Sequence, residues 1–270
     1  MPDLLPAILP FARDLVACLR FYTRLPLPAL SFETDPFGML DFSAGIRVLP
    51  LAGALIGLAA ALVLWLGAGL GLPSLVAAAL ALAALVAVTG AMHEDGLADF
   101  ADGLGGATRE RRLEIMRDSR LGTFGGAALA FSIVLRVAAL AALADRFGPG
   151  AAGAALVAAA AVSRAAGMLP LVLLPPARPD GVGHAAARPN FETLNLAAGL
   201  ATLVALLVPF AGIGFARMLL GLLLALGAAY GVAMLARRRL GGQTGDVAGA
   251  AQQGAETAFL LALLIGARVA

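Results

Sequence analysis

The chain has 270 residues, of which 61% are apolar and 13% charged, and its formal net charge at neutral pH is +2. Soluble domains carry about a quarter charged residues, so this composition excludes an ordinary soluble domain. The mean hydropathy of +0.92 instead predicts a protein that crosses a lipid bilayer several times. The one cysteine, Cys18, excludes an internal disulfide and a cysteine-based metal site.

The first segment, 4 to 22, mixes apolar residues with Arg13, Asp14 and Arg20 and contains two prolines. It lacks the basic start, uninterrupted apolar core and small-residue cleavage site of a signal peptide. We therefore predict an N-terminal amphipathic or partly inserted helix.

Apolar runs of about 20 residues, the length that crosses the hydrocarbon core, follow at 49 to 70, 75 to 92, 124 to 144, 151 to 174, 194 to 212 and 216 to 236. A seventh candidate, 257 to 267, is too short unless 247 to 256 extend it. The pattern predicts an all-α fold, a polytopic transmembrane helical bundle of about six to seven spans with short cytoplasmic helices. No linker, repeat or composition shift divides the chain, so we expect one integral membrane domain over 1 to 270.

All basic residues are arginines, and most of them fall on one side of the predicted spans. They precede the first span and follow the second, fourth and sixth, whereas the opposite loops hold mainly Arg146 and Arg217. The positive-inside rule then places the N-terminus and the segment 93 to 123 in the cytoplasm. The pI near 9.3 is explained by this topology and by anionic lipid, so no nucleic-acid partner is expected.

The sequence HEDGLADFADG at 93 to 103 sets four acidic residues directly after the second apolar run. On a helix, Asp95, Asp99 and Asp102 lie at i, i+4 and i+7 and share one face. Carboxylates clustered near a membrane are costly without a cation, and oxygen ligands suit Mg²⁺. We expect these three aspartates to bind Mg²⁺, with Glu94 as a secondary ligand; the alternative is a solvated acidic helix.

The next polar segment, TRERRLEIMRDSRLGTFG, begins as an ordinary salt-bridged surface helix. It ends with Arg117, Asp118 and Arg120 just before the third span. Arginine suits a bidentate grip on phosphate, and Asp118 is a further candidate metal ligand. Alternatively, these arginines only flank a span as topology signals.

A glycine-rich segment, GGQTGDVAGAAQQGAE at 241 to 256, forms a second candidate site. Its glycines allow backbone N–H groups to face an anion, and Thr244 or Asp246 can cap the helix that follows. On that helix Asp246, Gln253 and Glu256 fall near one face. Glycine-rich turns between spans are common, so the segment alone is weak support for a phosphate site.

Two arginines, Arg136 and Arg164, lie inside apolar spans, where a charge is expected to have a partner or a function. Asp118, Asp246 or a bound phosphate are candidate partners, and a structural ion pair is the alternative. Together, the acidic face and the arginines indicate phosphoryl transfer from a nucleotide-activated donor, in which the protein positions reactants and neutralises charge. One carboxylate would accept the proton of an attacking hydroxyl.

HEDGLADFADGLGG followed by RERRLEIMRDSRLGTFG resembles the signature of the adenosylcobinamide-GDP ribazoletransferases, the cobalamin (5′-phosphate) synthase family. The sequences FYTRLPLP at 21 to 28, LPLAGALIG at 49 to 57, SRA at 163 to 165 and GGQTGDVAGAAQQ at 241 to 253 extend the resemblance over essentially the whole chain. It implies a Mg²⁺-dependent enzyme of the bacterial cytoplasmic (inner) membrane. That enzyme joins adenosylcobinamide-GDP to α-ribazole, or to its 5′-phosphate, and releases GMP.

Carried over by position, the resemblance implies metal binding by Asp95, Asp99 and Asp102, with Glu94 and Asp118 secondary. Either Asp99 or Asp102 would be the catalytic base. The implied substrate-binding residues are Arg117, Arg120, Arg164, Thr244, Asp246 and Gln253. The loop 175 to 193 matches the family pattern least, and its His184 and Asn190 are speculative substrate contacts outside that pattern. The lipid bilayer is the other expected partner, and a homo-oligomer or a complex with other enzymes of the pathway is left open.

Two other functions compete with this interpretation. The spacing DGxxDxxDG is similar to that of the CDP-alcohol phosphotransferases, which make phospholipids. Their pattern places Ala-Arg after the first Asp-Gly, where this chain has Leu97 and Ala98. A membrane transporter is the second alternative, because intramembrane charges and broken helices also mark ion pathways. No mirrored pair of interrupted helices is visible in the sequence.

Overall fold

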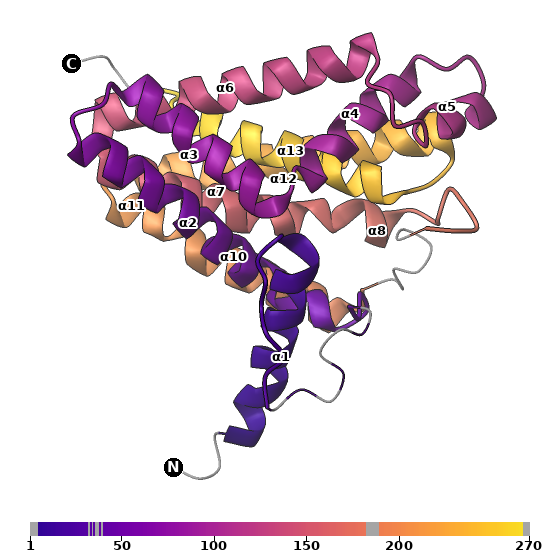
Figure 1. Ribbon diagram of the computed structural model, residues 1–270, viewed down its shortest axis with the longest axis horizontal. Coiled ribbons are helices and arrows are strands. Elements are labelled where there is room, and N and C mark those ends of the chain that lie inside the picture. The colour runs from indigo at the N-terminus through magenta and orange to yellow at the C-terminus, as the bar shows by residue number, and fades with distance from the viewer. Residues whose placement is uncertain are drawn as a thin grey trace.

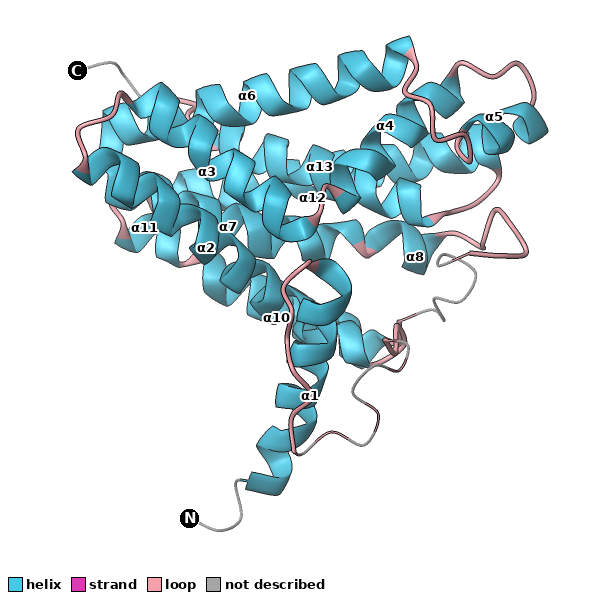
Figure 2. Ribbon diagram, in the orientation of Figure 1, coloured by secondary structure: helices cyan, strands magenta, loops and turns pink. Residues whose placement is uncertain are grey.

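The computed structural model describes residues 5–31, 33, 35, 38, 40–181 and 189–266 of the chain. Within these ranges the fold is all-helical, and the one β-bridge, between Pro176 and Gln243, is isolated. The predicted all-α class is confirmed (Figures 1 and 2). The helices are α1 Leu5–Tyr22, η1 Gly45–Val48, α2 Leu49–Gly69, α3 Ser74–Thr89, α4 Met92–Leu104, α5 Arg109–Ile115, α6 Thr123–Phe147, α7 Pro149–Gly167, α8 Leu169–Leu173, α10 Phe191–Ala205, α11 Leu207–Phe210, α12 Phe215–Leu240 and α13 Gly245–Ala262.

Five helical stretches are long and apolar enough to cross a membrane, and a bent pair of helices makes a sixth. The protein is therefore a multi-pass membrane protein, as its composition predicts. The five stretches are Gly45–Gly69, Thr123–Phe147, Pro149–Leu173, Phe191–Phe210 and Phe215–Leu240. Each of them contains or overlaps one of the predicted apolar runs.

The bent pair consists of α3 and α4, which meet at an angle of 89°. With 16 residues, α3 is shorter than the roughly 20 residues that a span needs. It ends at two consecutive residues in the left-handed region, Gly90 (φ 65°) and Ala91 (φ 59°), and the N–H of Ala91 donates to Val86 O, closing a Schellman-type cap. The acidic segment is thus the second helix of a bent pair, which forms a broken span or a re-entrant loop, and it packs against α13 and α6. Its predicted position on the cytoplasmic side stays a prediction.

The seventh predicted span falls on α13, which is not among the stretches apolar enough to face lipid. This helix carries Gln252, Gln253 and Glu256, and all three side chains are buried. The surrounding protein makes that possible, because α12, α7, α4 and α6 all pack against α13 (Figure 1). A polar helix at membrane depth is tolerated when other helices, not lipid, enclose it.

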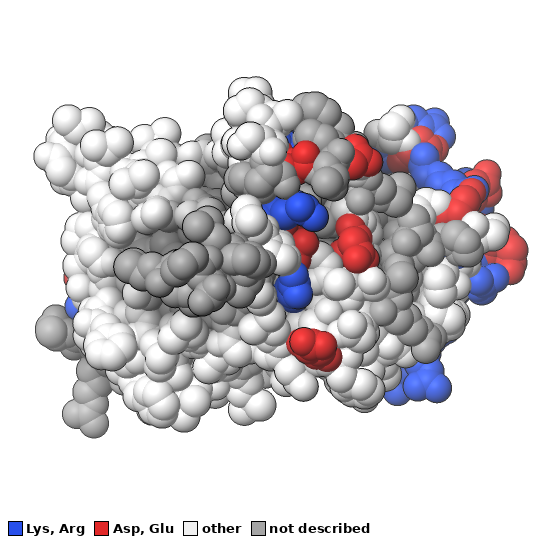
Figure 3. All heavy atoms as spheres, turned by 90° about the horizontal axis from the view of Figure 1, so that it is seen from below, with Lys and Arg blue, Asp and Glu red and all other residues white. Residues whose placement is uncertain are grey.

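Charged side chains have an uneven distribution over the molecule. On the face that Figure 3 shows, they gather at the end where α5 lies in Figure 1 and around the middle of the face, and few are visible toward the opposite end. Beside the bundle, α1 projects away from the spanning helices (Figure 1), and its Ile8 and Phe11 side chains are exposed. An ion pair of 2.7 Å between Asp14 and Arg47 ties α1 to η1. The predicted N-terminal helix is present, and its insertion into the membrane surface stays a prediction.

A buried ion-pair network joins α4, α6 and α13. The Arg136 guanidinium of α6 is fully buried and pairs with Glu94 at 3.2 Å and with Glu256 at 3.0 Å. The amide of Gln253 donates to Glu94 at 3.0 Å, and that of Gln252 donates to Glu256 at 2.8 Å. The structure thus bears out the alternative of a structural ion pair for Arg136, with Glu94 and Glu256 in place of the candidates Asp118 and Asp246. These partners depend on which helices are neighbours, and sequence spacing does not contain that information.

Replacing Arg136 with methionine is expected to destabilise the protein strongly, because the Glu94 and Glu256 carboxylates lose their cation inside the bundle. Breaking one partner of a buried pair costs about 3 to 5 kcal/mol. Thermal unfolding in detergent, followed by circular dichroism, measures the loss. The matched control is Arg146→Met, at the exposed end of the same helix, and equal unfolding temperatures for the two variants would contradict the prediction.

Candidate active site

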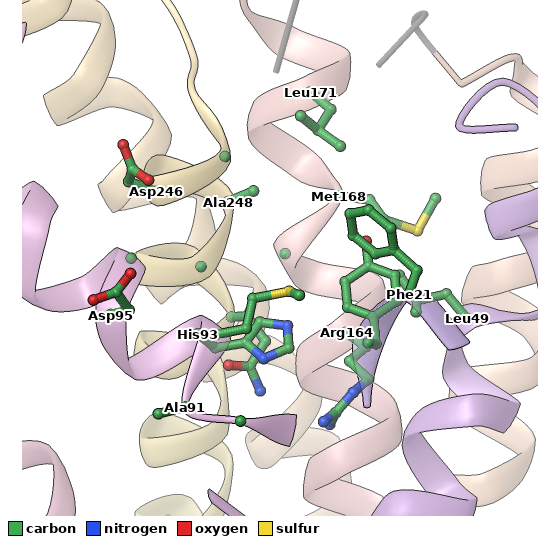
Figure 4. Close-up of a pocket in the computed structure, with 18 of the residues that line it drawn as sticks. Phe21, Leu49, Ala91, His93, Asp95, Arg164, Met168, Leu171, Asp246 and Ala248 are labelled. Carbon is green, nitrogen blue, oxygen red and sulfur yellow. The ribbon is translucent and has the colours of Figure 1, made fainter. Parts of the chain in front are cut away.

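Four aspartates approach one another where α4 meets the start of α13. Asp95 and Asp246 line the same cavity (Figure 4). The negative charges of Asp95, Asp102 and Asp246 act on Asp99, and Arg178 is the nearby cation. Arg178 also pairs with Asp246 at 3.4 Å. The shared acidic face predicted for α4 is therefore a real feature of the fold, and Asp246 adds a fourth carboxylate to it.

Glycines allow the two acidic helices to lie this close. A Cβ on Gly96 would stand 3.1 Å from Asp246 Cα and 3.4 Å from Gly249 Cα. Gly249 in turn faces the backbone of His93 on α4. The strip without side chains beside the aspartates is thus the contact surface of α4 with α13, and a larger residue at Gly96 would push the carboxylates apart.

The three α4 aspartates differ in their surroundings. Both oxygens of Asp102 accept hydrogen bonds from the backbone, from Gly122 N and Gly125 N, each at 2.8 Å. These N–H groups belong to the start of α6, where the first turn leaves donors unpaired and the helix dipole favours a negative charge. Asp102 therefore caps α6 from another helix, and its role as metal ligand or base stays a prediction.

Asp95 and Asp99 have no such partner. In the described part of the chain, neither carboxylate has a hydrogen bond or an ion pair within 4 Å. Two uncompensated carboxylates beside Asp246 are electrostatically unfavourable, so this is the part of the site that a cation would stabilise most. Glu94 lies elsewhere, since its side chain points into the core against Arg136.

The segment before α6 stands apart from the cavity. Asp118 pairs with Arg120 at 2.6 Å, and hydrogen bonds from Arg120 lower the pKa of Asp118 to about 2. Arg117 pairs with Asp180 at 2.6 Å, and all four side chains are on the surface. To bind a substrate, these arginines would have to break their present ion pairs. Their phosphate-binding role stays a prediction.

The cavity that Asp95 and Asp246 line has a volume of about 490 Å³. Phe21, Tyr22 and Phe42 also line it. Figure 4 shows Phe21 across the cavity from Asp95 and Asp246, with Arg164 at the floor. Arg164 is 2% exposed; its Nη1 donates to Ala160 O at 2.9 Å. Its Nε and Nη2 have no hydrogen-bond partner among the described residues. Buried N–H groups are normally bonded, so an anionic ligand is the expected partner.

The other predicted binding residues have structural contacts of their own. Thr244 caps α13, because its hydroxyl oxygen accepts from Val247 N at 3.3 Å. Gln253 belongs to the buried network around Glu94, and Asn190 caps α10 through Thr193 N at 2.8 Å. His184 lies outside the described residues. Of the predicted set, Asp95, Asp246 and Arg164 line one cavity, and Asp99 lies close enough to Asp95 and Asp246 for their charges to act on it.

Sequence reasoning missed the aromatic side of the cavity. Phe21 and Tyr22 stand about 70 positions before the acidic helix, and Tyr22 stacks on His93 with ring centroids 5.7 Å apart. The only sequence signal for these aromatic residues was the motif FYTRLPLP at 21 to 28, which belongs to the family pattern but had no role assigned to it. Gln252 and Glu256 were also missed as members of the buried network.

The donor set of the site suits a magnesium ion. Within the described residues, no group of three or more histidine, cysteine, aspartate or glutamate side chains is arranged to hold a metal by itself. Mg²⁺ is usually held by one or two carboxylates together with waters and substrate phosphates. The unpaired carboxylates of Asp95 and Asp99 fit that pattern, with Asp246 beside them.

Residues 14–264 match the protein family described as cobalamin-5-phosphate synthase. The adenosylcobinamide-GDP ribazoletransferase of Azorhizobium caulinodans is 52% identical over 259 residues, covering 94% of this chain and 96% of that protein. The proteins of the same name from Xanthobacter autotrophicus and Brucella anthropi are 51% and 44% identical, over 94% and 93% of the chain and 96% of each relative. No solved structure gives a significant match. The chain thus belongs to the cobalamin-5-phosphate synthase family.

Proposed function

We propose that the acidic face of α4, together with Asp246, is the centre at which this transferase joins adenosylcobinamide-GDP to α-ribazole or its 5′-phosphate. The family itself supports the overall activity, the final step of cobalamin assembly. The observation that carries the placement of the centre is that Asp95 and Asp99 have no hydrogen-bond or ion-pair partner among the described residues, next to a cavity that Asp95 and Asp246 line.

The reaction is a phosphoryl transfer. A ribose hydroxyl oxygen of the acceptor forms a bond to the phosphorus that is attached to cobinamide. The bond from that phosphorus to the bridging oxygen breaks, and GMP leaves with that oxygen. The hydroxyl proton passes to a carboxylate, for which Asp99 is our choice because the oxygens of Asp102 are occupied by the α6 backbone.

A magnesium ion held by Asp95, with Asp246 beside it, would neutralise part of the pyrophosphate charge and leave Asp99 as the proton acceptor. The chain's own contribution is positioning. The Arg136 ion pairs hold α4 through Glu94, and Gly96 lets α4 approach α13 closely. Asp102 fixes the start of α6 against the same helix.

For the cellular setting, we propose the bacterial cytoplasmic membrane with the charged end of the bundle in the cytoplasm. The arginine distribution supports this orientation through the positive-inside rule, and few charged groups are visible toward the opposite end of the face in Figure 3. The nucleotide donor is a cytoplasmic molecule, so its reacting phosphate would reach the site from that side.

Replacing Asp99 with asparagine is expected to lower GMP release by on the order of 100-fold or more, because the proton acceptor is lost. Purified protein in lipid, supplied with adenosylcobinamide-GDP, α-ribazole and Mg²⁺, provides the assay. Asp145→Asn is the control, since Asp145 lies exposed near the far end of α6. Near-normal release by the Asp99 variant would remove Asp99 from the mechanism.

Removal of divalent cations with a chelator is expected to stop GMP release, and added Mg²⁺ should restore it. In an Asp95→Asn variant, half-maximal activity should require more Mg²⁺ than in the unmodified protein, because one of its ligands becomes neutral. A titration of initial rate against free Mg²⁺ measures both effects. Full activity in the chelator would refute the metal requirement.

The choice of donor separates this function from phospholipid synthesis. The unmodified protein is expected to turn over adenosylcobinamide-GDP and to leave CDP-diacylglycerol intact under the same conditions. Product analysis by chromatography measures both reactions. Turnover of the lipid donor alone would contradict the proposal.

A further inference from the structure

The cavity beside Asp95 has two chemically distinct sides (Figure 4). One side carries the two carboxylates of Asp95 and Asp246. The other side is aromatic and continuous, because Phe21 contacts both neighbouring rings edge-on, Phe42 at 5.3 Å and Tyr22 at 4.8 Å between centroids. Tyr22 then stacks on His93. Flat, apolar ligands bind such walls by stacking and by burial of ring surface.

At the floor of the same cavity, Arg164 presents N–H groups without a hydrogen-bond partner, while the carboxylates of Glu256 and Glu94 act on its charge. Arg164 is buried, and its Nε and Nη2 groups have no partner among the described residues. A buried guanidinium with free N–H groups matches a phosphate better than any neutral ligand. The ligand should therefore combine a planar apolar ring with an anionic group, and should present a reacting group to the carboxylates.

The volume and the polarity of the cavity indicate which of the two substrates it binds. Cavities of roughly 300 to 1,000 Å³ hold drug-sized molecules, so about 490 Å³ is too small for the corrin macrocycle of the donor. The guanosine part of the donor is small enough, but guanine carries hydrogen-bonding groups that lose free energy against an apolar wall. The dimethylbenzimidazole ring of an α-ribazole is planar and apolar, and its ribose carries the attacking hydroxyl.

We infer that this cavity is the acceptor subsite, and that Arg164 binds the 5′-phosphate of the incoming benzimidazole riboside. The ring lies against Phe21, Tyr22 and Phe42, and the ribose lies at the Asp95 and Asp246 end of the cavity, the end from which its attacking hydroxyl would reach the neighbouring Asp99. Arg164 is then the residue that makes the enzyme prefer the phosphorylated acceptor. The inference rests on the proposed function and assigns Arg164 to the acceptor rather than to the donor pyrophosphate.

The test compares α-ribazole with α-ribazole 5′-phosphate as acceptors for the full-length protein in lipid. In an Arg164→Met variant, the KM for the phosphorylated acceptor is expected to rise on the order of ten- to hundredfold, the loss of one charge-assisted hydrogen-bonding group. The KM values for α-ribazole and for adenosylcobinamide-GDP should change by less than about threefold, a difference near the error of such measurements.

Arg24 is the control, because it also lines the cavity but is exposed at its edge. An Arg24→Met variant should keep the preference for the phosphorylated acceptor. A selective loss in the Arg24 variant instead, or a rise in the KM for adenosylcobinamide-GDP in the Arg164 variant, would overturn the inference. In either case GMP release by the unmodified protein continues, so the proposed function would survive.

A second variant keeps the inference testable if Arg164→Met fails to fold. Phe42→Leu removes ring surface from the wall and should weaken both acceptors alike, severalfold, with the donor KM unchanged. Phe131→Leu is its matched control, since Phe131 is 69% exposed on the outer face of α6. An effect of Phe42→Leu on the donor alone would place the donor, not the acceptor, in this cavity.

Discussion

The ion pairs of Arg136 with Glu94 and Glu256 are the interaction on which the rest of the structure depends. None of these three charges can be buried in lipid alone at acceptable cost, so α4, α6 and α13 must meet at the depth of Arg136. The requirement explains why α13, with its buried glutamines, is enclosed by other helices. It also explains why an acidic helix follows an apolar one without leaving the bundle.

The same ion pair sets the rotation of α4 and therefore the direction of its aspartates. Successive residues on a helix point about 100° apart, so Glu94 in the core turns Asp95 toward the cavity. The distance between α4 and α13 is set separately, by Gly96 and Gly249. Rotation and distance together bring Asp95 and Asp99 beside Asp246, although these residues are about 150 positions apart in the chain.

The three aspartates of the acidic face have different contacts, although their spacing on the helix is regular. Asp102 accepts from the first backbone N–H groups of α6, while Asp95 and Asp99 have no hydrogen-bond or ion-pair partner among the described residues. A carboxylate that anchors a helix is fixed in place, whereas an unpartnered one is able to bind a cation or accept a proton. The aromatic wall and Arg164 complete the cavity. Together they suit a ligand that combines a flat apolar ring with a negatively charged group.

The sequence by itself determined the all-helical membrane class, the apolar runs, the shared face of the three aspartates and the family, because hydropathy, periodicity and long motifs are local properties of the chain. Only the tertiary structure decided the partners of Arg136, the capping role of Asp102 and the meeting of Phe21 and Tyr22 with the acidic helix. It also turned α4 into the bundle, through left-handed backbone at Gly90 and Ala91, and alanine gives no signal of that conformation. These features depend on which helices are neighbours, and contacts between distant segments leave no periodic trace in one sequence.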